Sequence, residues 1–219
     1  MNWLGILVSY VYIALVIVGG KIFAKKGKEA SRKFIHIMLG NWWLIAMYYF
    51  TNVWFAAFVP ATFVIINYLS YKKDLIKVME REKQDGLGTV YYALSLLILT
   101  IVSFGIYKNP SLGLAPCLVM AYGDGLAAII GKKIKSKTYK IGDTTKSIAG
   151  SLTMFTIALL VIEAYLLFQH GPVIFWRNAH WSLVTIMMAY CMTSIEAVSI
   201  KGTDNITVPL GTLLMLILI

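Results

Sequence analysis

The sequence predicts an all-α integral membrane protein, a bundle of about eight transmembrane helices forming a single domain over residues 1–219. Three observations carry this prediction. Hydrophobic residues make up 59% of the chain and charged residues 14%, whereas soluble domains are roughly half apolar and a quarter charged. The mean hydropathy is +0.75. Apolar runs close to the length of one membrane crossing, about 20 residues, recur between clusters of charge.

These apolar runs give the expected helices in order along the chain. The first lacks a basic leading segment and a small-residue cleavage site, so it indicates an uncleaved helix and not a signal peptide. The second is short and is expected to begin within residues 31–36, and the last ends at Ile219. The expected spans are 3–23, 35–50, 53–71, 89–107, 112–130, 148–168, 181–200 and 206–219.

The basic residues predict how the helices are oriented. Of the 20 Lys and Arg residues, 18 lie after the first, third, fifth and seventh spans, which leaves Lys108 and Arg177 for the other side. The positive-inside rule then places those four loops in the cytoplasm and both termini outside. The formal charge of +10 therefore indicates orientation and contact with anionic lipid, and we expect no nucleic-acid partner.

A carboxylate inside a membrane helix costs at least about 2.5 kcal/mol on insertion scales, so each one needs a partner or a function. Asp124 lies about two turns inside the cytoplasmic end of the fifth span. Gly123 and Gly125 flank it, and Lys132 and Lys133 end the helix. The small residues allow a helix or a phosphate to approach closely, but a tight helix crossing alone would not explain the carboxylate.

Residues 142–151 end the third basic loop and open the sixth helix. Lys146 and Ser147, with the backbone N–H groups of a helix start, predict a phosphate-binding segment. The alternative is an ordinary Ser or Thr helix cap, with Lys146 as a topology charge. The spacing of glycines and lysines here and at 125–133 does not fit a P-loop.

Two further segments place polar residues near the same membrane face. Arg32, Lys33 and His36 lead into the second span, where the alternative is a basic anchor beside the membrane. Glu196 lies near the inner end of the seventh span, and Asp204 with Asn205 begins the eighth. Asp204 alone could simply cap that helix.

All these segments fall in the inner half of the membrane or just beyond it, because odd-numbered helices run inward and even-numbered ones return. Lysines beside carboxylates in a lipid-lined bundle suit a polyphosphate donor with Mg²⁺ and an acceptor that is itself a lipid. Phosphoryl transfer requires mainly charge neutralisation and in-line placement. Transport is the non-enzymatic alternative, but it predicts polar residues through the outer half, where Glu163 stands almost alone.

These motifs together resemble the CTP-dependent lipid kinases of the dolichol kinase and phytol kinase family, in the order in which that family carries them. The resemblance implies transfer of the γ-phosphate of CTP, with Mg²⁺, to the hydroxyl of a long isoprenoid alcohol at the cytoplasmic face, in the plasma membrane if the source is prokaryotic. Phosphatidate cytidylyltransferases, which make CDP-diacylglycerol, are similar over 124–150 but differ in the lead-in to Lys146 and at the C-terminal end. They rank second, followed by a CTP-dependent diacylglycerol kinase.

Within this hypothesis each candidate residue has an expected role. Asp124 and Asp204 hold Mg²⁺, with help from Asn205. Glu196 accepts the proton of the alcohol, and Asp124 could exchange roles with it. The residues expected to bind the nucleotide and its phosphates are Arg32, Lys33, His36, Gly123, Gly125, Lys132, Lys133, Lys146, Ser147 and Asn205.

Overall fold

The computed structural model describes residues 1–73, 87–141, 144–171 and 179–219 and is almost entirely helical. Its elements in chain order are α1 (Asn2–Phe23), η1 (Ala24–Lys26), α2 (Lys28–Gly40), α3 (Trp42–Tyr49), α4 (Val53–Lys73), α5 (Gly88–Thr100), η3 (Ile101–Ile106), η4 (Pro110–Gly113), α6 (Leu114–Leu118), η5 (Val119–Asp124), α7 (Gly125–Lys133), β1 (Thr138–Ile141), β2 (Thr144–Ser147), α8 (Ile148–His170), α10 (Ala179–Val198) and α11 (Asp204–Leu218).

The predicted all-α polytopic membrane fold is confirmed. Among the described residues, six helical segments are long and apolar enough to cross a membrane, and α11 is a shorter apolar helix. The predicted span 35–50 corresponds to the end of α2 together with α3, and 206–219 corresponds to α11. Two spans contain π-helical segments, η3 and η5, which the sequence analysis did not predict.

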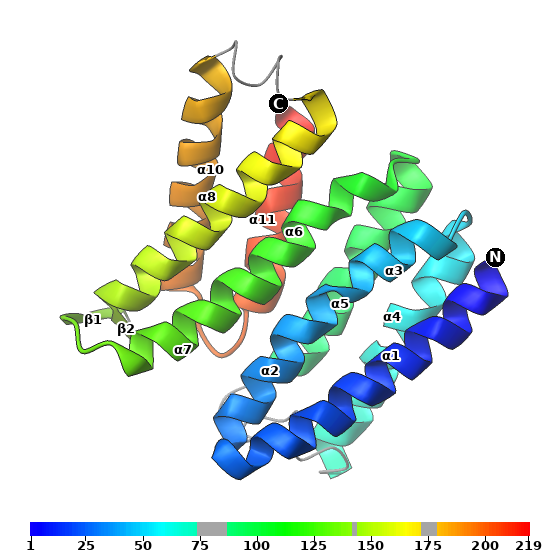
Figure 1. The fold of residues 1–219 in the computed structure, drawn as a ribbon, viewed down its shortest axis with the longest axis horizontal. Coiled ribbons are helices and arrows are strands. Elements are labelled where there is room, and N and C mark those ends of the chain that lie inside the picture. Colours follow the sequence, from blue (N-terminus) through cyan, green and yellow to red (C-terminus); the bar gives the residue numbers. More distant parts are fainter. Residues whose placement is uncertain (74–86, 142–143, 172–178) are drawn as a thin grey trace.

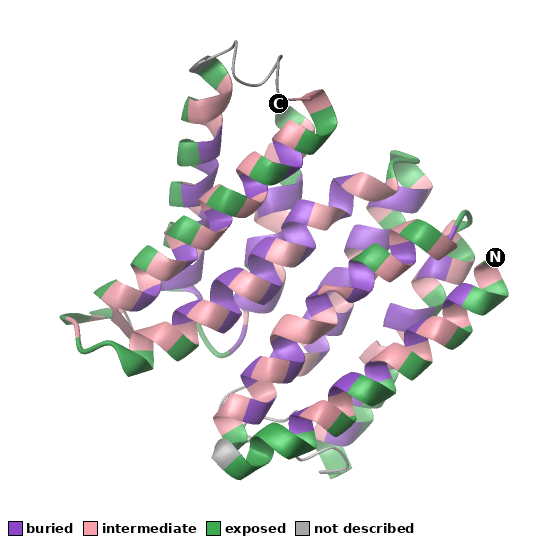
Figure 2. Ribbon diagram, viewed as in Figure 1, coloured by how far each residue is buried: buried purple, intermediate pink, exposed green. Residues whose placement is uncertain are grey.

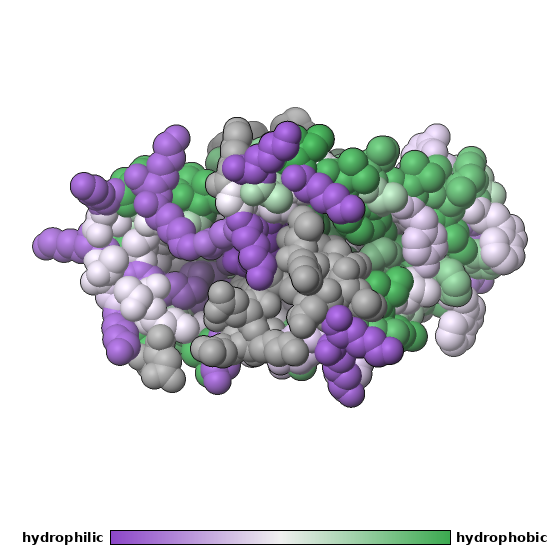
Figure 3. All heavy atoms as spheres, turned by 90° about the horizontal axis from the view of Figure 1, so that it is seen from below, coloured by the Kyte–Doolittle hydropathy of each residue, from purple (hydrophilic) through white to green (hydrophobic). Residues whose placement is uncertain are grey.

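The basic segments lie at one end of the bundle. Figure 1 shows the α1–α2 junction, the β1–β2 hairpin and the α10–α11 junction at the lower end, with both termini toward the opposite end. Seen from below, hydrophilic side chains gather on this face (Figure 3). Four of the charges used to predict orientation, Lys77, Arg81, Lys83 and Arg177, lie outside the described residues.

The segment from Pro110 to Lys133 is the centre of the bundle. Its most apolar window is 61% buried, more than that of the other candidate spans. Figure 2 shows buried residues on the faces that the helices turn toward one another and exposed residues on the outer faces of α8 and α10. The exposed side chains include Leu152, Leu160 and Leu183. Apolar side chains on the outside of a polytopic bundle are suited to contact with lipid.

The third basic loop contains a β-hairpin, which the sequence analysis did not predict. Strands β1 and β2 pair antiparallel, with Thr138 opposite Ser147 and Tyr139 opposite Lys146. Threonine, tyrosine and isoleucine favour strands, and their pairing satisfies backbone groups next to the membrane. The hairpin leads directly into α8, so it determines where Lys146 and Ser147 stand relative to the bundle.

Helix α2 packs closely on the central segment through glycines. A Cβ added at Gly40 would overlap the Cβ of Ala121 in η5, and one at Gly125 would overlap Ile37. The Cβ of Ala121 is fixed to the backbone, so side-chain rotation cannot relieve the contact at Gly40. The close approach brings Lys33 and His36 of α2 to the end of η5, where Asp124 lies.

We expect Gly40→Ala to destabilise the protein, because the added methyl would force α2 away from η5. Overpacking of this kind costs about 1–3 kcal/mol, which exceeds the helix propensity gained by replacing glycine with alanine. The measurement is the melting temperature of the purified protein in detergent. Gly105→Ala is the matched control, because its nearest neighbour would be the end of the Val53 side chain at 3.3 Å. Equal melting temperatures for the two variants would contradict the packing argument.

Candidate active site

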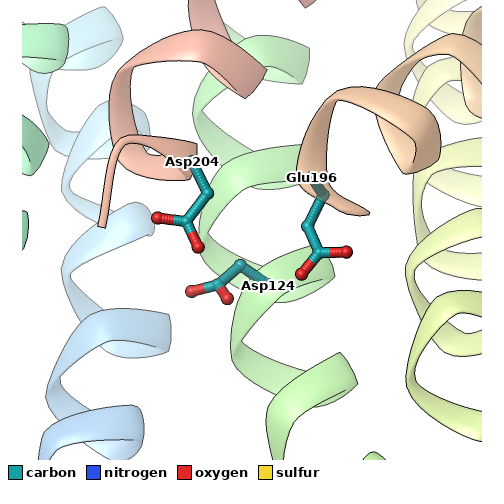
Figure 4. Close-up of side chains that lie close together, drawn as sticks. All are labelled: Asp124, Glu196 and Asp204. Carbon is teal, nitrogen blue, oxygen red and sulfur yellow. The ribbon is translucent and has the colours of Figure 1, made fainter. Parts of the chain in front are cut away.

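Three carboxylates from three different helical segments meet near the end of the bundle that carries the basic residues. Asp124, Glu196 and Asp204 each offer an oxygen, and these oxygens lie within 4.8 Å of one another. Figure 4 shows the side chains converging from the central segment, α10 and α11. The three residues are only 6%, 4% and 7% exposed. Burying ionised carboxylates this close together is costly unless nearby cations balance their charge.

The position of Asp124 depends on the π-helical segment η5, of which it is the last residue. A π-turn carries one extra residue per turn, so it rotates the following side chains relative to a regular α-helix, and such turns are frequent at functional sites. Asp204 is the first residue of α11, after a turn in which Gly202 has a φ of 81°. Glu196 lies two residues before the end of α10 at Val198.

Helix α2 supplies basic groups to Asp124. Lys33 is 2% exposed, and its Nζ donates to Oδ2 of Asp124 at 2.8 Å and to the Asp124 carbonyl oxygen at 3.3 Å. The Nε2 of His36 lies 3.2 Å from the same Oδ2 and 3.2 Å from the carbonyl oxygen of Met120. Lys33 and His36, which the sequence suggested as nucleotide- and phosphate-binding residues, therefore contact Asp124 in the structure.

Glu196 has its own cation, Lys146 of strand β2, which forms an ion pair with it. Burial lowers the pKa of Lys146, but the charge of Glu196 and the hydrogen bond to it outweigh burial and raise the pKa above its usual value. The ammonium group therefore remains protonated at neutral pH. The hairpin thus places a permanent positive charge beside the carboxylate cluster.

The cluster opens into a polar cleft of about 1240 Å³, which includes its opening to solvent. The cleft is lined by Glu29, Arg32, Lys33, Asp124, Ala127, Ala128, Gly131, Lys132, Thr138, Thr144, Thr145, Lys146, Ser147, Gly150, Ser151, Glu196, Ser199, Lys201, Gly202 and Asp204. Five lysines and arginines and several hydroxyls therefore surround three buried carboxylates, an arrangement suited to a polyphosphate accompanied by a metal ion.

Ser147 is the N-cap of α8, as the alternative interpretation of this segment expected. Its Oγ accepts a hydrogen bond from the N–H of Gly150 at 3.1 Å and donates one to the carbonyl oxygen of Gly131 at 3.2 Å. The end of α7 and the start of α8 meet at Gly131 and Gly150, where an added Cβ on Gly131 would lie 3.2 Å from the Gly150 Cα. Ser147 also lines the cleft, so it organises the wall beside Lys146.

The structure does not bring every predicted residue to the cleft. Gly123 packs against Met154 and Gly125 against Ile37, so these glycines serve helix packing and are not among the cleft-lining residues. Lys133 is exposed at the end of α7 and likewise does not line the cleft. Lys132 lines the cleft and pairs with Glu29. Asn205 and His36 line a second, smaller pocket beside the cleft.

Several cleft residues were not predicted as site residues. Glu29 lies among the basic residues of the first loop. An acidic residue in an otherwise basic loop could have indicated an ion pair there. Ser199 lies one helical turn after Glu196, and that spacing could have placed it on the same face. Ser151 lies in the first turn of α8, within the segment 142–151 that the sequence singles out. Thr138 could not have been found, because the hairpin that positions it has no strong sequence signal.

The three carboxylates fit the requirements of a divalent metal ion. Mg²⁺ prefers oxygen ligands, usually one or two carboxylates together with phosphate oxygens and water. The cluster brings three carboxylate groups to within 4.8 Å of one another, with Lys33 in contact with Asp124 and Lys146 in contact with Glu196. An additional positive charge would therefore reduce the repulsion among the carboxylates.

Comparison with known proteins identifies relatives over nearly the whole chain. A phytol kinase of Synechocystis is 30% identical over 97% of this chain and 90% of its own length. Phytol kinase 1 of Arabidopsis thaliana and a probable phytol kinase 1 of Glycine max are each 31% identical. The alignments cover 85% and 84% of this chain but only 65% and 64% of those chloroplastic proteins. No protein-family model and no solved structure matches the chain.

The similarity to the Synechocystis protein spans the helices that carry the carboxylate cluster, the basic residues and the cleft. The expected relationship to phytol kinases is therefore confirmed. This chain is a multi-pass membrane protein that belongs to the phytol kinase family.

Proposed function

We propose that this protein is a CTP-dependent kinase that phosphorylates the hydroxyl of a long-chain isoprenoid alcohol of the phytol or polyprenol type. One observation carries the proposal: a buried triad of carboxylates, balanced by Lys33 and Lys146, lies at the base of a basic cleft inside a membrane bundle. The relatives named phytol kinase support the acceptor class. The choice of CTP rests on the resemblance of the motifs to lipid kinases that use it.

The reaction joins the alcohol oxygen to the γ-phosphorus while the bond from that phosphorus to the bridging oxygen of the donor breaks. The products are the prenyl monophosphate and CDP, and the hydroxyl proton is transferred to a carboxylate. Glu196 or Asp124 can accept it, because both belong to the same cluster. Lys146, Arg32 and Lys132 would neutralise the phosphate oxygens from the walls of the cleft. Charge neutralisation and placement of this kind supply most of the catalysis of phosphoryl transfer.

Asp124 and Asp204 are the residues that would hold Mg²⁺, with Glu196 beside them. Held there, the metal ion would supply positive charge beside the phosphate groups of the nucleotide. Lys33 would keep Asp124 ionised and oriented, because its Nζ donates to both the carboxylate and the main chain of that residue.

We further propose that the cleft faces the cytoplasm, where nucleoside triphosphates are available. The basic loops support this orientation, since 18 of the 20 Lys and Arg residues belong to them by sequence. In a prokaryote the protein would then act at the inner face of the plasma membrane.

The position of the transferred phosphate tests the proposal. With CTP labelled at the γ-phosphate and phytol as acceptor, we expect the label to appear in a lipid monophosphate. Parallel assays with ATP, GTP and UTP measure the preference for CTP, and diacylglycerol as acceptor tests the diacylglycerol kinase alternative. If the α-phosphate and cytidine were instead transferred to phosphatidate, the protein would be a cytidylyltransferase and the proposal would be wrong.

We expect Asp124→Asn to reduce kcat by roughly a thousandfold, because the amide removes a negative charge needed at the reacting centre. Leaving Lys33 buried without its partner also threatens folding. The double variant Asp124→Asn/Lys33→Gln removes both charges and keeps the packing. It should fold, as judged by its melting temperature, and remain inactive. Glu163→Gln in α8, outside the cleft, is the control and should retain activity. Full activity in the double variant would remove Asp124 from the mechanism.

Metal dependence provides a separate prediction. Treatment with EDTA should abolish turnover, and Mg²⁺ should restore it. In Asp204→Asn, the Mg²⁺ concentration giving half-maximal rate should rise by roughly tenfold or more, because one charged ligand has been lost. Initial rates measured against Mg²⁺ at saturating nucleotide provide the comparison. An unchanged Mg²⁺ requirement would argue that Asp204 is not a ligand.

A further inference from the structure

Two smaller pockets extend from the cleft toward the interior of the bundle. The first, of about 410 Å³ including its opening to the surroundings, is bounded by α2, α4, α5 and α11, and Arg32 lines both it and the cleft. The second, of about 370 Å³ on the same measure, shares Leu39, Asn67 and Tyr92 with the first, so the two adjoin. Its other walls are almost wholly apolar: Ile13, Trp42, Val59, Pro60, Phe63, Ala93 and Leu96. Polarity therefore falls steadily from the cleft inward.

Asn205 stands at the polar end of this path with an unused hydrogen-bond acceptor. It is 3% exposed, and its Nδ2 donates to the carbonyl oxygen of Gly88 at 3.1 Å, which fixes the orientation of the amide. Its Oδ1 is buried and has no hydrogen-bond partner among the residues that the structure describes. A buried acceptor without a partner costs about 1–3 kcal/mol, so its retention in the pocket wall favours a ligand that donates to it.

The path also reaches the carboxylate cluster. Asn205 follows Asp204 directly, and His36 lines the first pocket while its Nε2 lies 3.2 Å from Oδ2 of Asp124. A hydroxyl bound at Asn205 would thus be adjacent to the residues that we propose to hold the metal and the phosphates. The Tyr92 hydroxyl donates to the carbonyl oxygen of His36 at 3.0 Å. This hydrogen bond joins α5 to α2 in the wall of the first pocket.

Building on the proposed function, we propose that the two pockets form the acceptor site, with the alcohol hydroxyl donating to Oδ1 of Asn205 and the isoprenoid tail extending past Tyr92 into the apolar pocket. The two pockets offer one hydrogen-bond acceptor at one end and apolar walls beyond it. An alcohol with a long apolar tail matches both features. The pocket that ends at Ile13, Trp42 and Val59 then determines which part of the tail the protein recognises. Asn205 would belong to the acceptor side of the reaction and not to the nucleotide.

An outer groove between α4 and α5 offers a competing place for the tail and supplies a matched control. It is apolar, is lined by Trp54, Ala61 and Leu97 among others, and shares no lining residue with the cleft or the two inner pockets. Ala93 lines the inner apolar pocket and Ala61 lines the outer groove. The same substitution at the two alanines therefore fills one space and not the other.

The experiment measures kcat and KM for geraniol, farnesol and geranylgeraniol, which carry two, three and four isoprene units. Ala93→Leu should lower kcat/KM for geranylgeraniol by roughly tenfold, because the added side chain occupies the space of the tail, and should leave geraniol within about twofold. Ala61→Leu should match the unmodified protein for all three alcohols. If Ala61→Leu were the variant that discriminated against the longer alcohol, the tail would lie in the outer groove and the inference would be wrong.

The hydroxyl contact is tested by Asn205→Leu, which keeps the size of the side chain and removes its acceptor. We expect KM for every alcohol to rise by about three- to tenfold, while KM for the nucleotide stays unchanged. A rise in KM for the nucleotide alone would assign Asn205 to the donor side and overturn the inference. If the unmodified protein phosphorylated none of the prenols, the proposed function itself would fail. Uniform kinetics across all variants would reject only the acceptor site.

Discussion

The central constraint on this structure is the repulsion among three carboxylates buried in a helical bundle. Asp124, Glu196 and Asp204 come from segments far apart in sequence, and their oxygens lie within 4.8 Å of one another. Burial removes the water that would screen them, so each helix around them must supply compensation. Helix α2 contributes Lys33 and the β-hairpin contributes Lys146. Gly40 and Gly125 permit the close approach of α2 to the central segment that brings Lys33 to Asp124.

This constraint links the structure to its chemistry. The charges that stabilise the cluster also line the cleft, so the groups that permit folding are the groups that would bind phosphate. Binding a divalent metal ion together with its nucleotide would reduce the repulsion among the carboxylates. Polar compensation is concentrated at one end of the bundle, while the opposite end of the path is apolar. A water-soluble donor and a lipid acceptor would therefore approach the reacting centre from different sides.

Most of the fold and much of the candidate site could be predicted from sequence. The length and hydropathy of the apolar runs indicated the helical membrane class, because spanning segments must satisfy their own backbone groups. The high cost of Asp124 and Glu196 in a membrane identified them as residues needing partners. The roles of Gly123 and Gly125 could not be decided from sequence, since a small residue permits the close approach of a phosphate and of a neighbouring helix equally. The structure shows the helix contacts, with Met154 and Ile37.

The sequence by itself determined that the chain crosses the membrane, because hydropathy is a local property. It also determined which charged residues are energetically costly to place in a membrane helix, because that cost depends on the residue and its position in the apolar run. Only the tertiary structure decided which cation balances which carboxylate, that Ser147 is committed to capping α8, and that Asn205 faces a pocket leading away from the cleft. Those facts depend on the rotation introduced by the π-helical segment, on the hairpin before α8 and on the close approach of α2. Each arises from contacts between residues distant in the chain, which no local pattern specifies.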